Sequence, residues 1–160
     1  MSSRVLVALR IDATPARVFE AFTAEIGQWW RDDPLFQPTR RRGGRMSLEP
    51  GDDGRLLVTY ADGKVAEVGR LRVWQPPERL VLTWCPTSFS ADQETEVHVA
   101  FEPVDGGTRV VVEHHGWDAI PAEHVARHGF PLLPFQQRLA EWWQVNLAAL
   151  GEQAAAAASD

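Results

Sequence analysis

The sequence of 160 residues contains a single cysteine, Cys85, and fewer basic than acidic residues, which gives a formal net charge of −6. One cysteine cannot form a disulfide within the chain, and so few cysteines are typical of proteins in a reducing compartment. We therefore expect a cytoplasmic protein. The acidic balance argues against nucleic acid as a partner, because neutralising phosphates requires clustered lysine and arginine.

Long apolar runs are also missing. The apolar run at residues 4–11 is too short to cross a bilayer, and it contains Arg10. It alternates as a β-strand does, so we expect neither a signal peptide nor membrane insertion. No internal repeat or long linker divides the chain. We expect one domain over residues 1–151 and a frayed tail at residues 152–160, where the alanines have nothing to pack against.

Hydrophobic periodicity predicts a strand, two short helices, six further strands and a long final helix. Six consecutive strands with short connections form an antiparallel meander, and an amphipathic helix must bury its apolar stripe against that sheet. A curved sheet around a helix can leave a cavity between the two. The expected strands are residues 4–11, 45–49, 55–60, 65–74, 79–84, 94–102 and 108–115, and the expected helices are 15–23, 24–30, a turn within 122–128, and one that begins near Pro134.

The segment 69–84, GRLRVWQPPERLVLTW, is the most specific pattern in the chain. It contains two amphipathic β runs, which end at Trp74 and Trp84. Proline cannot donate to a sheet ladder, so Pro76 and Pro77 belong to the corner between the two strands. This corner places Trp84 at the end of a central strand, where its ring would either line a pocket or fill it.

With these features in this order, the chain resembles the START-like superfamily, also called SRPBCC or helix-grip proteins. Within it, the chain is most similar to the bacterial branch related to the activator of heat-shock protein 90 ATPase. The match spans nearly the whole chain. It is carried by Ala13, Pro15, Val18 and Phe19; Trp29 and Trp30; Gly69 and the corner from Trp74 to Leu80; Thr83 and Trp84; Val97 to Phe101; Gly107 and Thr108; His115 to Trp117; and Trp142, Trp143 and Leu147.

The resemblance implies an α+β helix-grip fold, with a curved antiparallel sheet of about seven strands wrapped on the long C-terminal helix. It also implies an interior apolar cavity that binds lipids, polyketides, hormones or other hydrophobic molecules, and a few branches are cyclases, aromatases or hydrolases. The chaperone-activating relatives carry an additional N-terminal domain that contributes to the chaperone contact. No segment of this sequence resembles that domain, which weighs against a co-chaperone role.

Our first hypothesis is that the cavity binds a small hydrophobic or aromatic ligand, without a cofactor, a metal or defined catalysis. Aromatic walls suit apolar ligands, and a few polar groups fix their orientation. The strand positions assume that the Val97 face points inward. The alternative is that the same side chains fill the interior completely. The candidate lining residues are Trp30, Phe36, Tyr60, Trp84, Phe89, Val97, Val99, His114, Phe130, Phe135 and Leu139.

Histidines offer the only other candidate chemistry. His114 and His115 are adjacent in a strand, so they point to opposite faces and cannot easily share a ligand. His124 and His128 have the i, i+4 spacing that places two side chains on one helical face, but no accompanying acid or cysteine completes a zinc site. We therefore expect structural histidines and no metal.

Two smaller features have competing interpretations. Cys85 lacks a visible base or electropositive setting, so we expect a buried, structural thiol. The arginines at positions 40, 41, 42 and 45 could hold the anionic head group of a ligand or contact a partner. The simpler interpretation is that they are solvated residues at the start of a strand.

Two further hypotheses remain open. In the second, a cyclase- or hydrolase-like enzyme uses His114 or His98 as general base, with Tyr60 or Arg42 polarising a carbonyl, and these groups must converge on the substrate. In the third, the protein acts by contact with another protein, as a homodimer or with a chaperone or regulator. An exposed apolar patch that includes Trp29 or Trp143 would favour this role.

Overall fold

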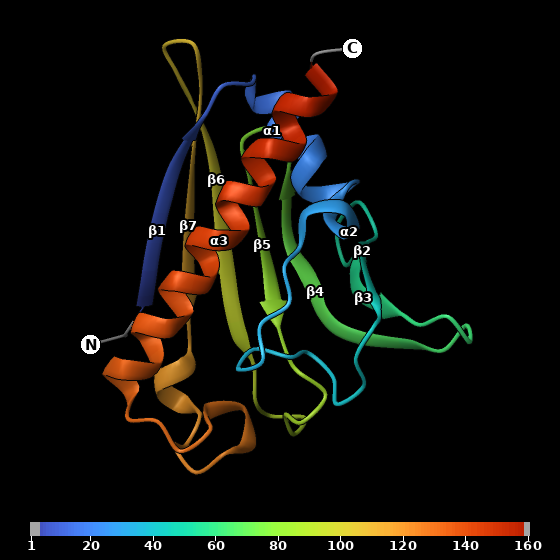
Figure 1. Cartoon of the computed structure of the whole chain (residues 1–160), viewed down its shortest axis with the longest axis vertical. Helices are drawn as coiled ribbons and strands as arrows, with labels where there is room; N and C mark the ends of the chain where they lie inside the picture. The colour runs from blue at the N-terminus through green and yellow to red at the C-terminus, as the bar shows by residue number, and fades with distance from the viewer. Residues whose placement is uncertain (1–3, 159–160) are drawn as a thin grey trace.

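The computed structural model describes residues 4–158, which form one sheet and one long helix with short helices at two of the connections (Figure 1). The strands are β1 (Arg4–Ile11), β2 (Arg45–Leu48), β3 (Arg55–Thr59), β4 (Val65–Gln75), β5 (Arg79–Trp84), β6 (Thr95–Val104) and β7 (Gly107–His115). The helices are α1 (Pro15–Thr23), α2 (Ile26–Trp29), the 3-10 turns η1 (Trp117–Ala119) and η2 (Val125–Arg127), and α3 (Leu132–Ala158).

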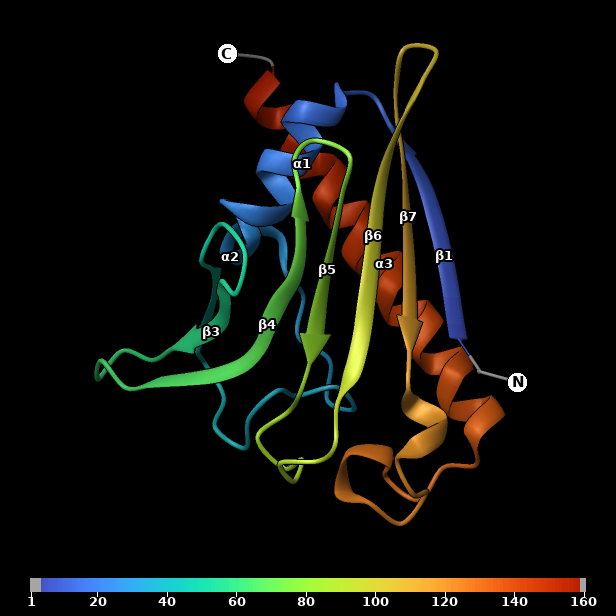
Figure 2. The ribbon, with the colours of Figure 1, turned by 180° about the vertical axis from the view of Figure 1, so that it is seen from behind.

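The sheet has seven strands in the order β1-β7-β6-β5-β4-β3-β2, and every neighbouring pair is antiparallel. The strands β2 to β7 therefore form the expected meander, and β1 adds an edge strand by pairing with β7. The sheet curves around α3 on one face, and Figure 2 shows the opposite face without a covering helix. This arrangement confirms the α+β helix-grip fold.

The short helix α1 begins where the sequence indicates. The side chain of Thr14 accepts a hydrogen bond from the backbone N–H of Arg17, and Pro15 occupies the first turn. Val18, Phe19 and Phe22 are buried on one side of the helix. This packing sets α1 and α2 against one end of α3.

Helix α3 lies diagonally across the inner face of the sheet (Figure 1). It begins at Leu132, so Pro134 lies within its first turn, where a missing N–H leaves no hydrogen bond unmade. Phe135, Leu139, Trp143 and Leu147 are each at most 1% exposed, which confirms the predicted apolar stripe. Within residues 4–158, no helix is both long and apolar enough to cross a membrane.

Helix α3 continues to Ala158 and so includes residues 152–158 of the tail that was expected to fray, whereas residues 159–160 lie outside the described part of the chain. Ala154 is fully buried, and Arg17 donates to the backbone carbonyls of Gln153 and Ala154. Arg17 also forms a bidentate pair with Glu25 at 2.6 and 2.8 Å, and the guanidinium lowers the pKa of that carboxyl to about 2. The Gln153 side chain donates to Glu25 at 2.7 Å, so polar contacts hold the last turns in place.

We predict that Arg17→Met loosens the end of α3 first. The Arg17 and Glu25 side chains are only 15% and 18% exposed, so we expect a loss of about 1 to 2 kcal/mol in the free energy of unfolding. Amide hydrogen exchange at residues 150–156 should accelerate more than in the sheet. The matched control is Arg109→Met, which removes a pair to Glu102 that is about half exposed on both sides and should change little. Equal protection of residues 150–156 in both variants would contradict this account.

Candidate functional site

Several aromatic side chains pack against one another between the sheet and α3. Trp30 lies at the centre of this packing, with ring centroids 5.5 Å from Trp84, 5.3 Å from Trp142 and 5.7 Å from Trp143. Phe36 stacks on Trp142 at 4.9 Å. We call these five residues the aromatic cluster. It occupies the position where the sequence predicted a ligand cavity, so much of the interior is packed by the protein's own side chains.

The two consecutive tryptophans of α3 point in different directions, as their positions on a helix require. The indole N–H of Trp143 donates to Nδ1 of His114 on β7 at 3.1 Å. The indole N–H of Trp142 donates to the backbone carbonyl of Arg31 at 2.9 Å. One ring therefore ties α3 to the sheet, and the other ties it to the loop of residues 30–44.

Several candidate lining residues belong to the packed core. The Val97 face of β6 does point inward, and Val97, Val99, Phe135 and Leu139 are each at most 1% exposed. Each is packed into the hydrophobic core, and none lines the largest pocket described below.

Four further candidates lie in different surroundings. Tyr60 is held by the Thr39 hydroxyl and the Arg41 carbonyl. Phe89 packs on Trp117 at 5.7 Å. Phe130 is half-buried, and Trp30 borders a second pocket of about 110 Å³.

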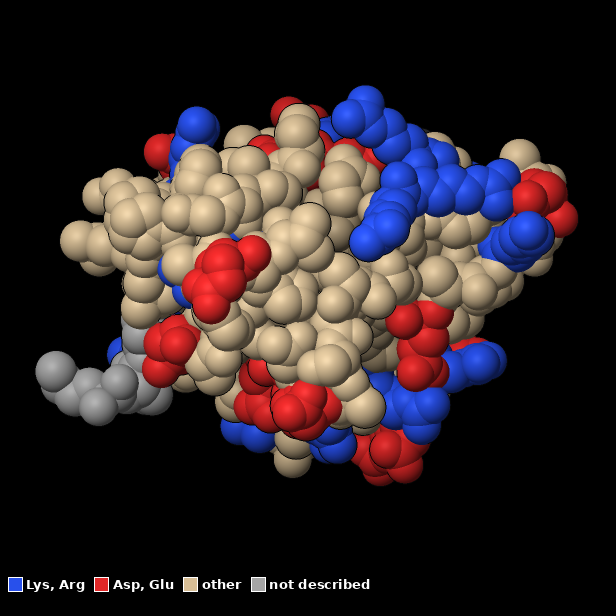
Figure 3. All heavy atoms as spheres, turned by 90° about the horizontal axis from the view of Figure 1, so that it is seen from below, with Lys and Arg blue, Asp and Glu red and all other residues tan. Residues whose placement is uncertain are grey.

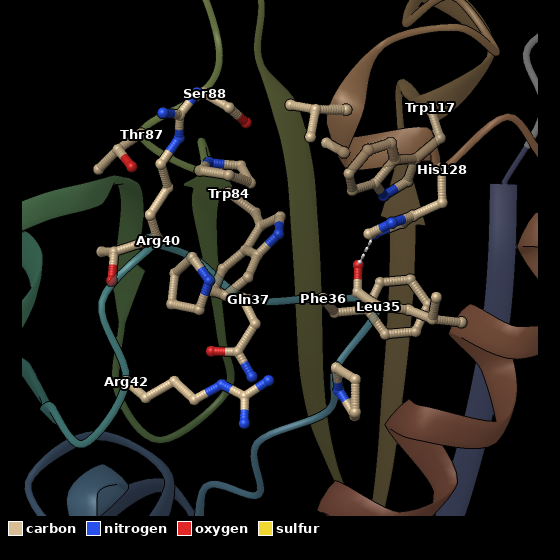
Figure 4. A pocket seen from close by; sticks show the side chains of 16 residues that line it. Leu35, Phe36, Gln37, Arg40, Arg42, Trp84, Thr87, Ser88, Trp117 and His128 are labelled. Atoms are coloured by element: carbon tan, nitrogen blue, oxygen red, sulfur yellow. Dashed lines mark hydrogen bonds between the residues drawn. The ribbon is translucent and has the colours of Figure 1, made fainter.

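A half-open pocket of about 200 Å³ lies at the loop end of the molecule, beside the aromatic cluster. We call it the loop-end pocket. Of the predicted lining residues it contains only Phe36 and Trp84. Figure 4 shows Arg40 and Arg42 on one side, Leu35, Phe36, Trp117 and His128 on the other, and Trp84 between them. The pocket is lined by Pro34 to Arg40, Arg42, Trp84, Pro86, Thr87, Ser88, Trp117, Val125, Ala126 and His128.

Three segments that are distant in sequence form the walls of the pocket, and hydrogen bonds join two of them to the loop of residues 30–44, which is the third. His128 donates from Nε2 to the carbonyl of Leu35 at 2.7 Å, which joins η2 to the loop of residues 30–44. Arg127 is 4% exposed and donates to the carbonyls of Ile120 and Phe130 at 2.6 Å each. The backbone N–H of Thr87 donates to the carbonyl of Pro38 at 2.8 Å and fixes the third wall.

The polar side chains of the pocket are mostly donors and hydroxyls, and Gln37 adds an amide that can both donate and accept. The indole nitrogen of Trp84, a residue 1% exposed, finds no hydrogen-bond partner among residues 4–158. In Figure 4 this nitrogen is directed toward the middle of the pocket, but the atom itself is buried. Arg40 and Arg42 extend from the rim, and Thr87 and Ser88 add hydroxyl groups. No Asp or Glu lines the pocket, so its electrostatic character is positive.

The walls formed by residues 86–88 and 125–128 are not among the site residues predicted from the sequence. These segments are loop and turn without hydrophobic periodicity, so no sequence pattern indicated that they converge. The run of arginines was the one available signal. Its two interpretations, a site for an anionic head group and a solvated strand start, both remain open, because Arg40 and Arg42 are exposed and also border the pocket.

His114 is buried outside this pocket, at 1% exposure. Trp117 and Trp143 direct their indole N–H groups at its two ring nitrogens, each at 3.1 Å, and Thr95 Oγ1 lies 2.9 Å from Nε2. Desolvation, with a smaller contribution from His115, lowers the pKa of His114 to about 3. A neutral ring can accept from one of the two indoles and a charged ring from neither, so the packing favours the neutral form.

The groups of the enzymatic hypothesis do not converge. His98 lies on the outer face of the sheet, where it bonds Glu96 at 2.7 Å and its ring contacts His115 at 4.8 Å. His114 is on the inner face, and Tyr60 is engaged with the 39–41 backbone and Thr39. Only Arg42 reaches the loop-end pocket.

The spacing of His124 and His128 does not produce a shared helical face. His124 caps the 3-10 turn η2 by accepting from the Ala126 N–H, whereas His128 follows it in a left-handed conformation and bonds Leu35. Among the described residues, no group of three or more His, Cys, Asp or Glu is arranged to hold a metal ion. Cys85 is half-buried, and burial raises the pKa of its thiol.

Comparison with known families gives the chain's affiliation. The sequence model of the family described as "Activator of Hsp90 ATPase homolog 1-like protein" matches residues 12–151. The chain belongs to this family. The predicted resemblance to START-like proteins, and to this branch of them, is confirmed. No curated protein matches the chain by sequence.

Solved structures share the family fold over nearly the whole chain. A protein from Bacillus halodurans is 17% identical with a TM-score of 0.67, covering 96% of this chain and 99% of that one. A Rhodobacter sphaeroides protein is 23% identical with a TM-score of 0.61, covering 96% and 93%. The structure described as the Aha1 dimer from Colwellia psychrerythraea is 18% identical with a TM-score of 0.59, covering 94% of each chain. At these identities the likeness shows the fold alone.

We predict that His114 makes the protein less stable in mild acid. The unfolded chain binds a proton near the ordinary histidine value of 6.5, whereas folded His114 does so only near pH 3. Its stabilising contribution is therefore complete above pH 6.5 and is lost as the pH falls toward 3. From pH 7 to pH 5 the loss from this group should be about 2 kcal/mol in urea unfolding.

The control is His114→Gln, which has no titrating ring and should show a correspondingly shallower loss between pH 7 and pH 5. If that variant does not fold, ring nitrogen chemical shifts of the wild-type protein serve instead. They should keep His114 neutral at pH 5, and a titration midpoint near pH 6.5 would overturn this assignment.

Proposed function

We propose that the protein binds a small, largely apolar ligand in the loop-end pocket. The observation that carries this proposal is the unsatisfied indole N–H of Trp84, which is buried and faces a pocket with apolar walls. A buried donor without a partner costs about 1 to 3 kcal/mol, and a bound acceptor would recover that energy. The family fold is compatible with such a role.

The dimensions of the pocket favour a ligand of one or two rings. Its volume of about 200 Å³ is below the roughly 300 to 1,000 Å³ of common small-molecule sites. The rings of Phe36 and Trp117 and the side chains of Leu35 and Val125 would contact the apolar body. The proposed ligand site therefore lies at the loop end of the molecule, whereas the sequence predicted a site between the sheet and α3.

Contact with a second copy of the chain is a second candidate role. β1 is an edge strand paired only with β7, and its Leu6 and Leu9 are 51% and 37% exposed. A relative of the same fold is described as a dimer. In contrast, Trp29 and Trp143 are at most 1% exposed, so the anchors first considered for a protein contact are not on the surface. We also propose that the protein is cytoplasmic, because a single cysteine is typical of proteins in a reducing compartment.

Filling the loop-end pocket should abolish ligand binding without unfolding the protein. We predict that Ala126→Trp, which places an indole at a half-buried position of the pocket wall, lowers the affinity for ring compounds at least roughly tenfold. The measurement is native mass spectrometry and calorimetry with small aromatic compounds, including those that copurify with the protein from its own host.

The matched control is Ala148→Trp on an exposed position of α3, outside the loop-end pocket. It adds the same side chain and should leave the affinity unchanged. Equal binding by the wild-type protein and by Ala126→Trp would place the ligand elsewhere and contradict the proposal. Circular dichroism checks that both variants keep the fold.

A further inference from the structure

We infer that the ligand of the loop-end pocket is a small aromatic or branched apolar monocarboxylate, whose carboxylate is bound by Arg40, Arg42 and the indole N–H of Trp84. This inference rests on the proposed function, because it assigns a chemical class to the ligand of the same pocket. Three independent features support it: the distribution of charge, the unsatisfied donor, and the separation of polar and apolar walls.

The charge of the pocket is opposite to that of the protein. The net charge is −6, yet the sixteen lining residues include two arginines and no carboxylate. Figure 3 views this end of the molecule and shows basic side chains gathered along one edge, beside a mostly uncharged surface. Positive charge of this kind in a concave site attracts anions and raises their local concentration.

Arg40 and Arg42 are free to bind a ligand. Among residues 4–158 neither pairs with a carboxylate, whereas Arg41 between them pairs with Asp62 at 2.8 Å. The two free guanidinium groups border the loop-end pocket, and Arg41 borders the second pocket. A planar guanidinium matches the two oxygens of a carboxylate, and such charge-assisted hydrogen bonds are stronger than neutral ones.

The Trp84 N–H supplies a donor that only an acceptor can satisfy. The indole has no acceptor of its own, and its nitrogen has no partner among the described residues. Figure 4 places this ring between the arginine side and the side that carries Leu35, Phe36 and Trp117. In Figure 4 the guanidinium groups of Arg40 and Arg42 point to opposite ends of the arginine side, so one of these exposed side chains has to turn toward the indole for a carboxylate to contact both arginines and the N–H. The apolar body of the ligand would then lie against the opposite wall.

The number of donors favours a carboxylate over a phosphate. One buried N–H and two flexible guanidinium groups suit two oxygens in a plane, whereas phosphate-binding sites supply several backbone N–H groups as well. The small volume and apolar far wall further restrict the body of the ligand to one or two rings or a short branched chain.

The test compares acids with neutral amides of the same shape, namely 2-naphthoate with 2-naphthamide and benzoate with benzamide. Binding is followed by the indole ¹H–¹⁵N resonance of Trp84, which is assigned as the peak lost in Trp84→Phe. The amide carbonyl can still accept from Trp84 but carries no charge. We expect the wild-type protein to bind at least one acid roughly tenfold or more tightly than its amide.

The variant Arg40→Gln/Arg42→Gln should reduce that preference to within about twofold while the amide binds as before. The control Arg70→Gln/Arg72→Gln removes the same two charges from exposed positions of β4 and should keep the preference. This pair of variants separates contact with the pocket arginines from a general effect of net charge.

Each outcome decides a different claim. If acids and amides bind equally and both shift the Trp84 resonance, the pocket binds ligands but the carboxylate inference is wrong. If the control variant loses the preference as fully as the pocket variant, Arg40 and Arg42 are not the carboxylate site. If none of the four compounds shifts the Trp84 resonance, the proposed function fails together with the inference.

Discussion

The packing of Trp30 against Trp84, Trp142 and Trp143 is the constraint on which the arrangement of the molecule depends. Rings from a loop, a strand and α3 meet here, so the cluster sets the separation between helix and sheet. The N–H of Trp142 and the stacking of Phe36 also fix the loop of residues 30–44 against the helix. Because protein interiors are close-packed, large side chains at this position leave little interior volume. The loop-end pocket instead lies beside the cluster, at the end of the molecule.

The position of the candidate site at the loop end determines which polar and charged groups line it. An interior cavity between sheet and helix would have apolar walls and little access to charge. The loop-end pocket instead shares Trp84 with the cluster and has arginines at its rim. Trp84 both packs the interior and presents its N–H to the pocket, whereas the neutral, buried His114 serves the packing alone. The protein thus has the family fold, but its candidate ligand site is the loop-end pocket and not the predicted cavity between the sheet and α3.

The fold could be predicted from sequence because its signals are local and periodic. The alternation in β6, the Thr14–Pro15 helix start and the proline corner before β5 each specify an element, and their order specifies the family. The site could not be predicted in the same way. Whether Val97 and Leu139 line a cavity or fill it depends on the rings packed opposite them, and the convergence of Arg40, Ser88 and His128 depends on irregular loops. The contacts that pack the tail could not be predicted, because Arg17 is distant from it in sequence.

A crystal structure of the protein with bound 2-naphthoate would show whether the ligand site lies at the loop end or in the interior. We expect the naphthalene rings to lie in the loop-end pocket against Phe36 and Trp117, with the carboxylate beside Trp84 Nε1 and the aromatic cluster unmoved. A ligand found between Trp30 and α3, with the cluster opened to admit it, would contradict the claim that the interior is filled and the site lies at the loop end.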